Sequence, residues 1–162
     1  MARLVISDAS PLIGLSRVDG LGWLPRLFGT VWIPGQVKRE ILSGRKTVDE
    51  TALRKAHERG WFKTWPEAIK PRGRLDLDEV ERACIELANR HPGSLLLIDE
   101  RDGRAQAREC GITIAGTAAV ISQARTQKLI PSARAVFEQL HKSDFRIAPE
   151  VIHAVLDRVG ER

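Results

Sequence analysis

The fold is decided by the stretch Leu4-Val5-Ile6-Ser7-Asp8-Ala9-Ser10-Pro11-Leu12-Ile13, near the start of the 162-residue chain. Its first half predicts a short apolar strand. Its second half predicts a helix, with Ser10 as a good N-cap and Pro11 at the first helical position. Asp8 then stands at the carboxyl end of a strand, beside a helix N-terminus. Ligands of open α/β sheets bind at that end of the strands, so Asp8 is the first candidate site residue.

Predicted strands and helices alternate along the rest of the chain. The apolar run 94–98 is typical of a parallel strand that is covered on both faces. The predicted strands cover 3–7, 30–33, 61–65, 94–98 and 112–114; the predicted helices cover 11–17, part of 20–29, 36–42, about 48–60, 78–90, 102–110 and 117–128, and two more lie around 133–140 and 152–159. This alternation predicts the α/β class with a mainly parallel sheet and a C-terminal helical hairpin.

Length and composition predict an ordinary soluble protein. A chain of 162 residues with 43% hydrophobic and 29% charged residues suits one domain, residues 1–162, with a proper core. We see no apolar run long enough for a membrane span and no signal peptide, so we expect a cytoplasmic protein that does not bind membranes. Cys84 and Cys110 are expected to be free thiols.

Polar residues follow three of the predicted strands. Asp8 follows the first strand, Asp99-Glu100 the fourth and Gly116-Thr117 the fifth. Parallel strands end at the same edge of a sheet, so Asp8 and Asp99 are expected to face each other if their strands are neighbours. Further acids lie on helices: Glu40 on the helix after the second strand, and Glu79 and Glu81 in the first turn of helix 78–90.

Such a set of carboxylates indicates a metal site. Crowded carboxylates repel one another unless a cation sits between them, and hard oxygen ligands suit Mg²⁺ or Mn²⁺. Such an ion can lower the pKa of a bound water and stabilise a phosphate during in-line displacement. The net charge of +5 favours a polyanionic partner. Acids, metal and basic surface together indicate a phosphodiesterase.

In their order and spacing these motifs resemble the PIN domain, the small metal-dependent nuclease fold found in VapC-type toxins. The resemblance covers residues 3 to about 128. It is carried by Val5 to Ile13, by Asp78-Glu79-Val80-Glu81, by Leu95 to Arg104 and by Ile114-Ala115-Gly116-Thr117. The branch it matches has Asp-x-Ser-Pro-Leu as its first motif. The resemblance implies a three-layer α/β/α sandwich around a sheet of four to five strands.

The resemblance also implies a site of three or four acids: Asp8, Glu40, Glu79 or Glu81, and Asp99 or Glu100, with Ser10 and Thr117 in support. Asp78 and Glu81 form an Asp-x-x-Glu capping box, which favours Glu79 as the ligand on that helix. Asp99 stands directly at the strand end, which favours it over Glu100. The predicted catalytic set is therefore Asp8, Glu40, Glu79 and Asp99, with Asp8 and Asp99 as metal ligands.

Two functions stay open. The first is a Mg²⁺- or Mn²⁺-dependent endoribonuclease that acts on RNA. The resemblance implies that it is the toxin of a toxin–antitoxin pair, with a small antitoxin protein and a second copy of the chain as partners. The second is a PIN-like module that binds RNA or protein and cleaves little or nothing. It is kept open because many family members have Thr-x-Asp after the fourth strand, where this chain has Ile98-Asp99-Glu100. The expected phosphate contacts are basic residues of the middle of the chain: Arg45, Lys46, Arg54, Lys55, Lys63, Lys70, Arg72 and Arg74.

Overall fold

The computed structural model describes residues 3–45, 47–72 and 76–162, and at its centre is a five-stranded sheet of order β3-β2-β1-β4-β5. Every strand pair is parallel. The strands are β1 (Val5–Ser7), β2 (Val31–Ile33), β3 (Lys63–Thr64), β4 (Leu95–Leu97) and β5 (Thr113–Ala115). β1 and β4 are neighbours, with Val5 opposite Leu95 and Ser7 opposite Leu97. The predicted parallel sheet is confirmed, and the adjacency of β1 and β4 places Asp8 and Asp99 at one edge.

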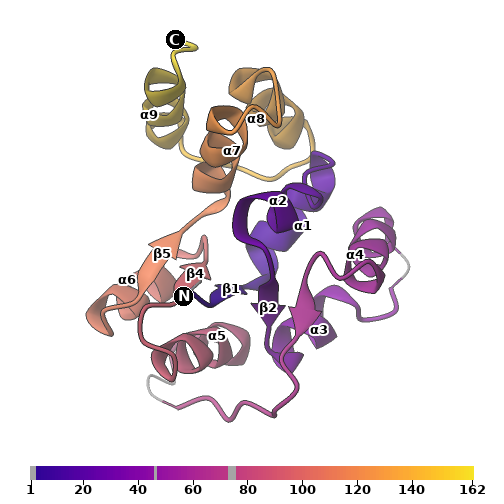
Figure 1. Ribbon diagram of the computed structural model, residues 1–162, viewed down its shortest axis with the longest axis vertical. Coiled ribbons are helices and arrows are strands. Elements are labelled where there is room, and N and C mark those ends of the chain that lie inside the picture. The colour runs from indigo at the N-terminus through magenta and orange to yellow at the C-terminus, as the bar shows by residue number, and fades with distance from the viewer. Residues whose placement is uncertain (1–2, 46, 73–75) are drawn as a thin grey trace.

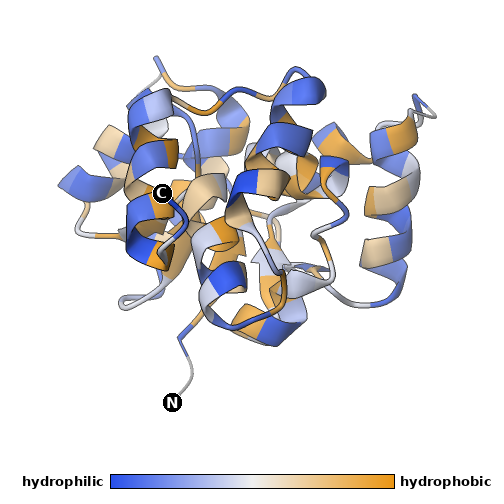
Figure 2. Cartoon of the chain, turned by 90° about the horizontal axis from the view of Figure 1, so that it is seen from above, coloured by the Kyte–Doolittle hydropathy of each residue, from blue (hydrophilic) through white to orange (hydrophobic). Residues whose placement is uncertain are grey.

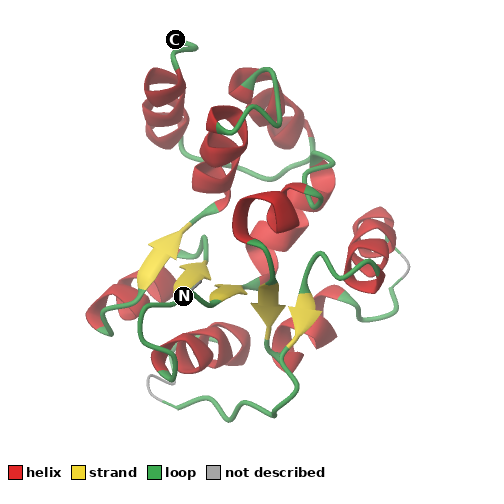
Figure 3. Cartoon of the chain, viewed as in Figure 1, coloured by secondary structure: helices red, strands yellow, loops and turns green. Residues whose placement is uncertain are grey.

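Helices surround the sheet, as Figure 3 shows with the yellow strands between red helices. They are α1 (Ala9–Arg17), α2 (Trp23–Phe28), α3 (Gly35–Ile41), α4 (Val48–Glu58), α5 (Glu79–Asn89), α6 (Arg101–Glu109), α7 (Thr117–Thr126), α8 (Ala133–Lys142) and α9 (Pro149–Val159). In Figure 1, α1 and α2 lie on one side of the row of strands and α3 and α5 on the other. The predicted α/β/α arrangement is therefore confirmed.

Burial follows from this layering. Every residue of β1 and β4 is buried, as expected for central parallel strands with helices on both faces, whereas the edge strands β3 and β5 have no buried residue. Figure 2 shows helices that are orange along one face and blue along the other, as amphipathic helices on a core should be. A second hydrophobic cluster joins α7, α8 and α9, where Phe137, Leu140 and Leu156 are buried. The C-terminal helices thus pack together beyond the end of the sheet.

The first helix begins earlier than the sequence predicts. It starts at Ala9, and Asp8 is its N-cap, with the Asp8 Oδ1 atom accepting a hydrogen bond from the Ala9 amide at 2.8 Å. The prediction of Ser10 as N-cap was wrong, because Asp8 satisfies the free amide first and leaves Ser10 inside the first turn. The Ser10 hydroxyl instead donates to Asp99 Oδ2 at 3.0 Å. Both residues of the opening motif therefore turn toward one site. In the residues that the structure describes, no helix is long and apolar enough to cross a membrane.

The chain end is tied to the start of α8 by Glu161. Its carboxylate accepts hydrogen bonds from the Ala133 amide at 2.6 Å and from the Ser132 hydroxyl at 2.8 Å, and it lies 3.3 Å from Arg125 Nε. These donors and the Arg125 charge outweigh burial and lower the pKa of Glu161 below its usual value. Glu161 thus caps a helix from outside that helix.

We expect Glu161→Gln to lower the free energy of unfolding by about 1–2 kcal/mol at pH 7, the typical cost of losing a helix cap. Because the folded-state pKa is the lower one, this contribution is present above the unfolded pKa of Glu and disappears as pH falls through the folded pKa. Urea unfolding at pH 7 and pH 3 measures it. Glu138→Gln, at an exposed position of α8, is the control. Equal losses in the two variants would contradict the role of Glu161.

Candidate active site

A pocket of about 760 Å³ opens at the carboxyl ends of the strands. Its floor is acidic: Asp8 follows β1, Asp99 and Glu100 follow β4, Glu40 lies on α3, and Asp78 and Glu81 lie at the start of α5. The wall above the floor is apolar and basic, and comes from α1, from the start of α7 and from the connection between α8 and α9. The lining residues are Asp8, Ala9, Ser10, Ile13, Arg17, Glu40, Asp78, Glu81, Asp99, Glu100, Arg104, Gly116, Ala118, Ala119, Asp144, Phe145, Arg146, Ile147, Ala148 and Val151.

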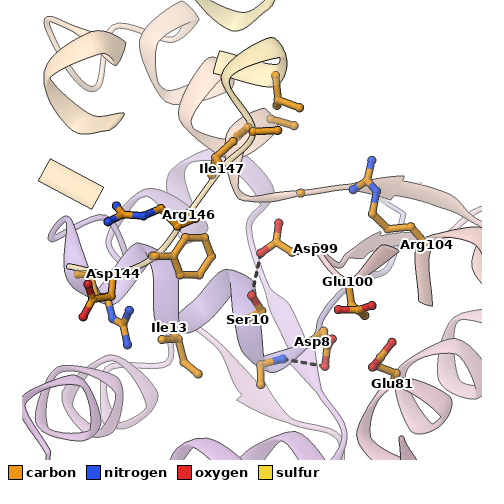
Figure 4. A pocket seen from close by; sticks show the side chains of 18 of the residues that line it. Asp8, Ser10, Ile13, Glu81, Asp99, Glu100, Arg104, Asp144, Arg146 and Ile147 are labelled. Carbon is orange, nitrogen blue, oxygen red and sulfur yellow. Dashed lines mark hydrogen bonds between the residues drawn. The ribbon is translucent and has the colours of Figure 1, made fainter. Parts of the chain in front are cut away.

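Asp8 lies at the bottom of this pocket with only 5% of its surface exposed. The Asp8 amide extends the sheet by donating to the Leu97 carbonyl at 2.9 Å, which fixes the backbone of Asp8 against β4. Below the carboxylate lies the fully buried thiol of Cys84, whose Sγ is 3.9 Å from Asp8 Oδ1. In Figure 4, Asp8 lies between Ser10 and Asp99 on one side and Glu81 on the other.

Asp99 is held by three donors. The Thr117 amide donates to Asp99 Oδ1 at 2.7 Å, and the Thr117 hydroxyl donates to Oδ2 at 2.7 Å. The third donor is the Ser10 hydroxyl. Thr117 is fully buried, so its hydroxyl has a fixed direction. The structure thus places Ser10 and Thr117 as orienting partners of Asp99, and a Cβ on Gly116 would lie 2.8 Å from Asp99 Oδ1.

The two candidate glutamates of α5 have different surroundings. Glu81 is buried, with 7% of its surface exposed, and lines the pocket. Glu79 is exposed and does not line it. The predicted cap is present on the backbone side, because Asp78 Oδ1 accepts from the Glu81 amide at 2.7 Å. That bond uses the main chain of Glu81, and the residue still lines the pocket. The structure therefore brings Glu81, and not Glu79, together with Asp8 and Asp99.

The two alternatives that follow β4, Asp99 and Glu100, and the acid on α3 are also placed by the structure. Glu100 is the N-cap of α6, where its Oε1 accepts from the Asp102 amide at 3.4 Å, and it also lines the pocket. The Asp99 charge raises the pKa of Asp8, whereas the Glu100 charge raises that of Glu81. Glu40 lines the pocket from an exposed position on α3.

Burial, with help from neighbouring charges, raises the pKa of three acids of the floor, Asp8, Glu40 and Glu81. Burial, together with the charges of Asp78, Glu40 and Asp99, raises the pKa of Asp8 to about 7, against the lowering effect of the Ala9 amide. Burial and the neighbouring Asp78 carboxyl raise the pKa of Glu81 to about 8, with smaller contributions from Asp8 and Glu100. The pKa of Glu40 is raised by burial and by Asp78. Asp8 and Glu81 therefore hold protons near neutral pH when no cation neutralises them.

The donor set fits a hard divalent cation. All donors of the floor are carboxylate or hydroxyl oxygens, the type that Mg²⁺ and Mn²⁺ prefer. Glu81 Oε2 is a buried oxygen for which the described part of the chain provides no hydrogen-bond partner, and a bound ion or water would satisfy a buried polar atom of this kind. Within the same residues, no three His, Cys, Asp or Glu side chains are already arranged to hold a metal ion. Binding would thus draw the carboxylates together.

Gly103 makes room for Glu81. A Cβ at residue 103 would collide with Glu81 Oε2 and would lie 2.7 Å from Ile98 Cδ1. Gly103 is a buried residue of α6, and both of these neighbours are buried as well. The sequence signal for this site residue is a glycine inside a helix, where glycine is otherwise unfavourable.

We expect Gly103→Ala to lower the free energy of unfolding by about 1–3 kcal/mol, the usual cost of overpacking, partly offset by the better helix propensity of alanine. Chemical denaturation measures the change. Gly35→Ala is the matched control, because at that helical position the new methyl meets only the end of the flexible Arg39 side chain, at 3.4 Å. A Gly103→Ala protein as stable as Gly35→Ala would contradict the proposed contact.

The basic residues that line the pocket differ from those that the sequence predicts. None of the expected phosphate contacts that the structure describes lines the pocket, and the other two, Lys46 and Arg74, lie outside the described residues. The arginines that do line it are Arg17, Arg104 and Arg146. Arg17 pairs with Asp49 at 3.2 Å, and Arg104 donates to the Ile98 carbonyl at 2.8 Å. Their positions depend on which helices pack above the sheet, and no local motif gives that.

Comparison with known proteins agrees with this geometry. No curated protein and no solved structure is a significant match to the chain. A family model described as PIN domain matches residues 4–161, which includes every element of the fold from β1 to α9. PIN domains are generally nucleases and typically use divalent metal ions. The match covers nearly the whole chain, and the chain therefore belongs to the PIN domain family.

Proposed function

We propose that the protein is a metal-dependent endoribonuclease that uses Mg²⁺ or Mn²⁺. The observation that carries the proposal is the convergence of Asp8, Glu81 and Asp99 on one pocket, with a buried oxygen of Glu81 that lacks a partner in the described residues. Burying this much negative charge is costly unless a cation or protons neutralise it. A divalent cation does so while leaving the carboxylates ionised.

In this proposal the side chains of the pocket have different roles. Asp8, Glu81 and Asp99 would hold the cation, and Ser10 and Thr117 keep the Asp99 carboxylate in one orientation. A bound Mg²⁺ or Mn²⁺ would lower the pKa of the attacking water and stabilise charge on the phosphate. Glu40, at the open side of the floor, is placed to accept a proton from water. The basic wall would contact the strand on both sides of the scissile phosphate.

The direct test is cleavage of RNA by the purified chain, free of any bound partner. We expect a fluorescently labelled RNA to be cut in Mn²⁺ or Mg²⁺, and cleavage to stop with EDTA and in Asp99→Asn. Arg158→Ala, at an exposed position of α9 outside the pocket, is the control. Cleavage that persists in EDTA, or that Asp99→Asn leaves unchanged, would show that another nuclease or another chemistry is responsible.

We also propose that the nuclease is the toxin of a toxin–antitoxin pair, that it is cytoplasmic and that it acts as a homodimer. The support is the motif pattern of the Asp-x-Ser-Pro-Leu branch. Expression in a bacterial host should then slow growth in a manner that requires Asp99, and a small protein encoded next to this chain should restore growth. Light scattering of the purified chain tests the dimer.

The second candidate is a module that binds RNA or protein without cutting. It is favoured by one observation: in the described residues, the acids are not arranged as a ready metal site. Calorimetric titration with Mn²⁺ separates the two candidates, because the nuclease should bind the ion and release protons from acids with raised pKa values. A chain that binds RNA but takes up no Mn²⁺ would be the binding module.

A further inference from the structure

We propose that the connection between α8 and α9, residues 143–148, forms a nucleotide subsite beside the acidic floor. In it, Arg146 contacts a backbone phosphate and Phe145 stacks on a base of the bound strand. The inference rests on the proposed function only in that the ligand is a nucleic acid. Residues of this connection face the same pocket as Asp8 and Asp99, and Val151 of α9 continues the surface.

The connection between α8 and α9 is held against the rest of the fold by contacts with α1. Arg17 Nη1 donates to the Ser143 carbonyl at 2.9 Å, while its other nitrogens bind Asp49. The Phe145 ring packs so closely on α1 that a Cβ at Gly14 would lie 3.0 Å from its Cε2 and Cζ atoms. A segment held in this way can offer a preformed surface to a ligand, which lowers the entropic cost of binding.

Arg146 supplies a cation without an acidic partner. It is exposed, and its contact in the described residues is a hydrogen bond from Nη1 to the His141 carbonyl, with no ion pair. In Figure 4, Arg146 and Arg104 lie on opposite sides of Asp99. A strand whose scissile phosphate meets the acids would bring a neighbouring phosphate toward each arginine. A planar guanidinium suits such a contact.

The apolar part of the wall suits a base. Phe145 and Ile147 line the pocket and are each partly exposed. Val151, which also lines the pocket, has 44% of its surface exposed. An aromatic ring beside a cation is the arrangement on which unpaired bases stack, whatever their sequence. The surface thus combines a phosphate contact with a stacking platform, next to the candidate cleavage site.

The test measures binding and does not require cleavage. The parent protein is the full chain with Asp8→Asn, measured in EDTA. One probe is a fluorescein-labelled oligoadenylate of about ten nucleotides, a length within the site size of single-strand binders. The other probe is an abasic ribose-phosphate chain of the same length. Fluorescence anisotropy gives the affinity of each probe at several salt concentrations. The variants are Arg146→Ala and Phe145→Leu, in which leucine keeps apolar contact with α1, and the control is Arg158→Ala. Thermal melts check that each variant is folded.

The two variants should affect binding of the two probes differently. Phe145→Leu should weaken binding of oligoadenylate about tenfold, within the range for loss of one stacked base, and leave the abasic probe within about twofold. Arg146→Ala should weaken both probes and reduce the slope of log affinity against log salt by about 0.7, the share of one phosphate on a single strand. The subsite is overturned if Phe145→Leu affects both probes equally, if Arg146→Ala matches Arg158→Ala, or if the parent binds neither probe. A protein that binds in this way but never cleaves RNA would refute the nuclease and leave the subsite standing.

Discussion

Asp8→Asn is expected to reduce RNA cleavage by more than about 100-fold, because loss of a metal ligand should cost at least as much as loss of its outer partners. The asparagine keeps the shape of the side chain and its bond to the Ala9 amide. It removes the negative charge on which the cation depends. Steady-state cleavage of a labelled RNA at saturating Mn²⁺ measures the effect. Residual activity near that of the parent would remove Asp8 from the site.

The same substitution should make the protein more stable. The pKa of Asp8 is about 7 in the folded protein, against an ordinary value of 3.8. Between these values the folded state keeps a proton that the unfolded state has lost, so the free energy of unfolding falls as pH rises from about 4 to about 7. An asparagine at this position has no charge to bury, so Asp8→Asn should be more stable than the parent at pH 8, by up to about 4 kcal/mol.

Urea unfolding in EDTA at pH 5 and pH 8 tests this. The gain should be complete at pH 8 and less than half as large at pH 5, and added Mn²⁺ should stabilise the parent more than the variant. Glu150→Gln, an exposed acid of α9, should show neither effect. An Asp8→Asn protein that is less stable than the parent at both pH values would mean that the carboxylate is structural. Loss of activity together with gain of stability is the signature of a site that stores electrostatic strain.

The part of the site that the sequence predicts is the part that strand geometry controls. Asp8 and Asp99 each follow an apolar run, and runs of that kind are buried parallel strands whose ends share an edge. Because β1 and β4 are neighbours and each acid follows its strand within two residues, Asp8 and Asp99 must lie close to the same edge of the sheet. The same reasoning finds Thr117, because it directly follows the strand β5 and Gly116.

Side chains on helices are harder to predict, since a helix turns by about 100° per residue. The capping pattern of α5 suggested that Glu81 serves as a helix cap and is not a metal ligand. The cap bond, however, uses the backbone amide of Glu81 and does not fix its carboxylate. The choice depends on which face of α5 packs on β1 and β4, and so on contacts distant in sequence. The connection at 143–148 shows the same limit. Its place over the pocket depends on Arg17 and Gly14 of α1, at the other end of the sequence.

Glu81→Gln is expected to lower cleavage by about 100-fold, whereas Glu79→Gln should stay within about twofold of the parent. Both substitutions replace a carboxyl group in the first turn of α5, and in the metal-bound protein both remove one negative charge beside the helix N-terminus. They differ in direction, because two residues along a helix correspond to about 200°. Only Glu81 lines the pocket, beside Asp8.

The pair also separates a metal ligand from a general electrostatic effect. If Glu81 holds the cation, Glu81→Gln should raise the Mn²⁺ concentration needed for half-maximal activity, and Glu79→Gln should leave it unchanged. The dependence on pH should differ too, since cation and proton compete for a carboxylate whose pKa is about 8 without metal. The parent should need less Mn²⁺ as pH rises from 7 to 9, and Glu81→Gln should lose most of that trend. A larger loss in Glu79→Gln would mean that α5 turns in solution to present its other face, and the acidic floor would then have to be rebuilt around Glu79.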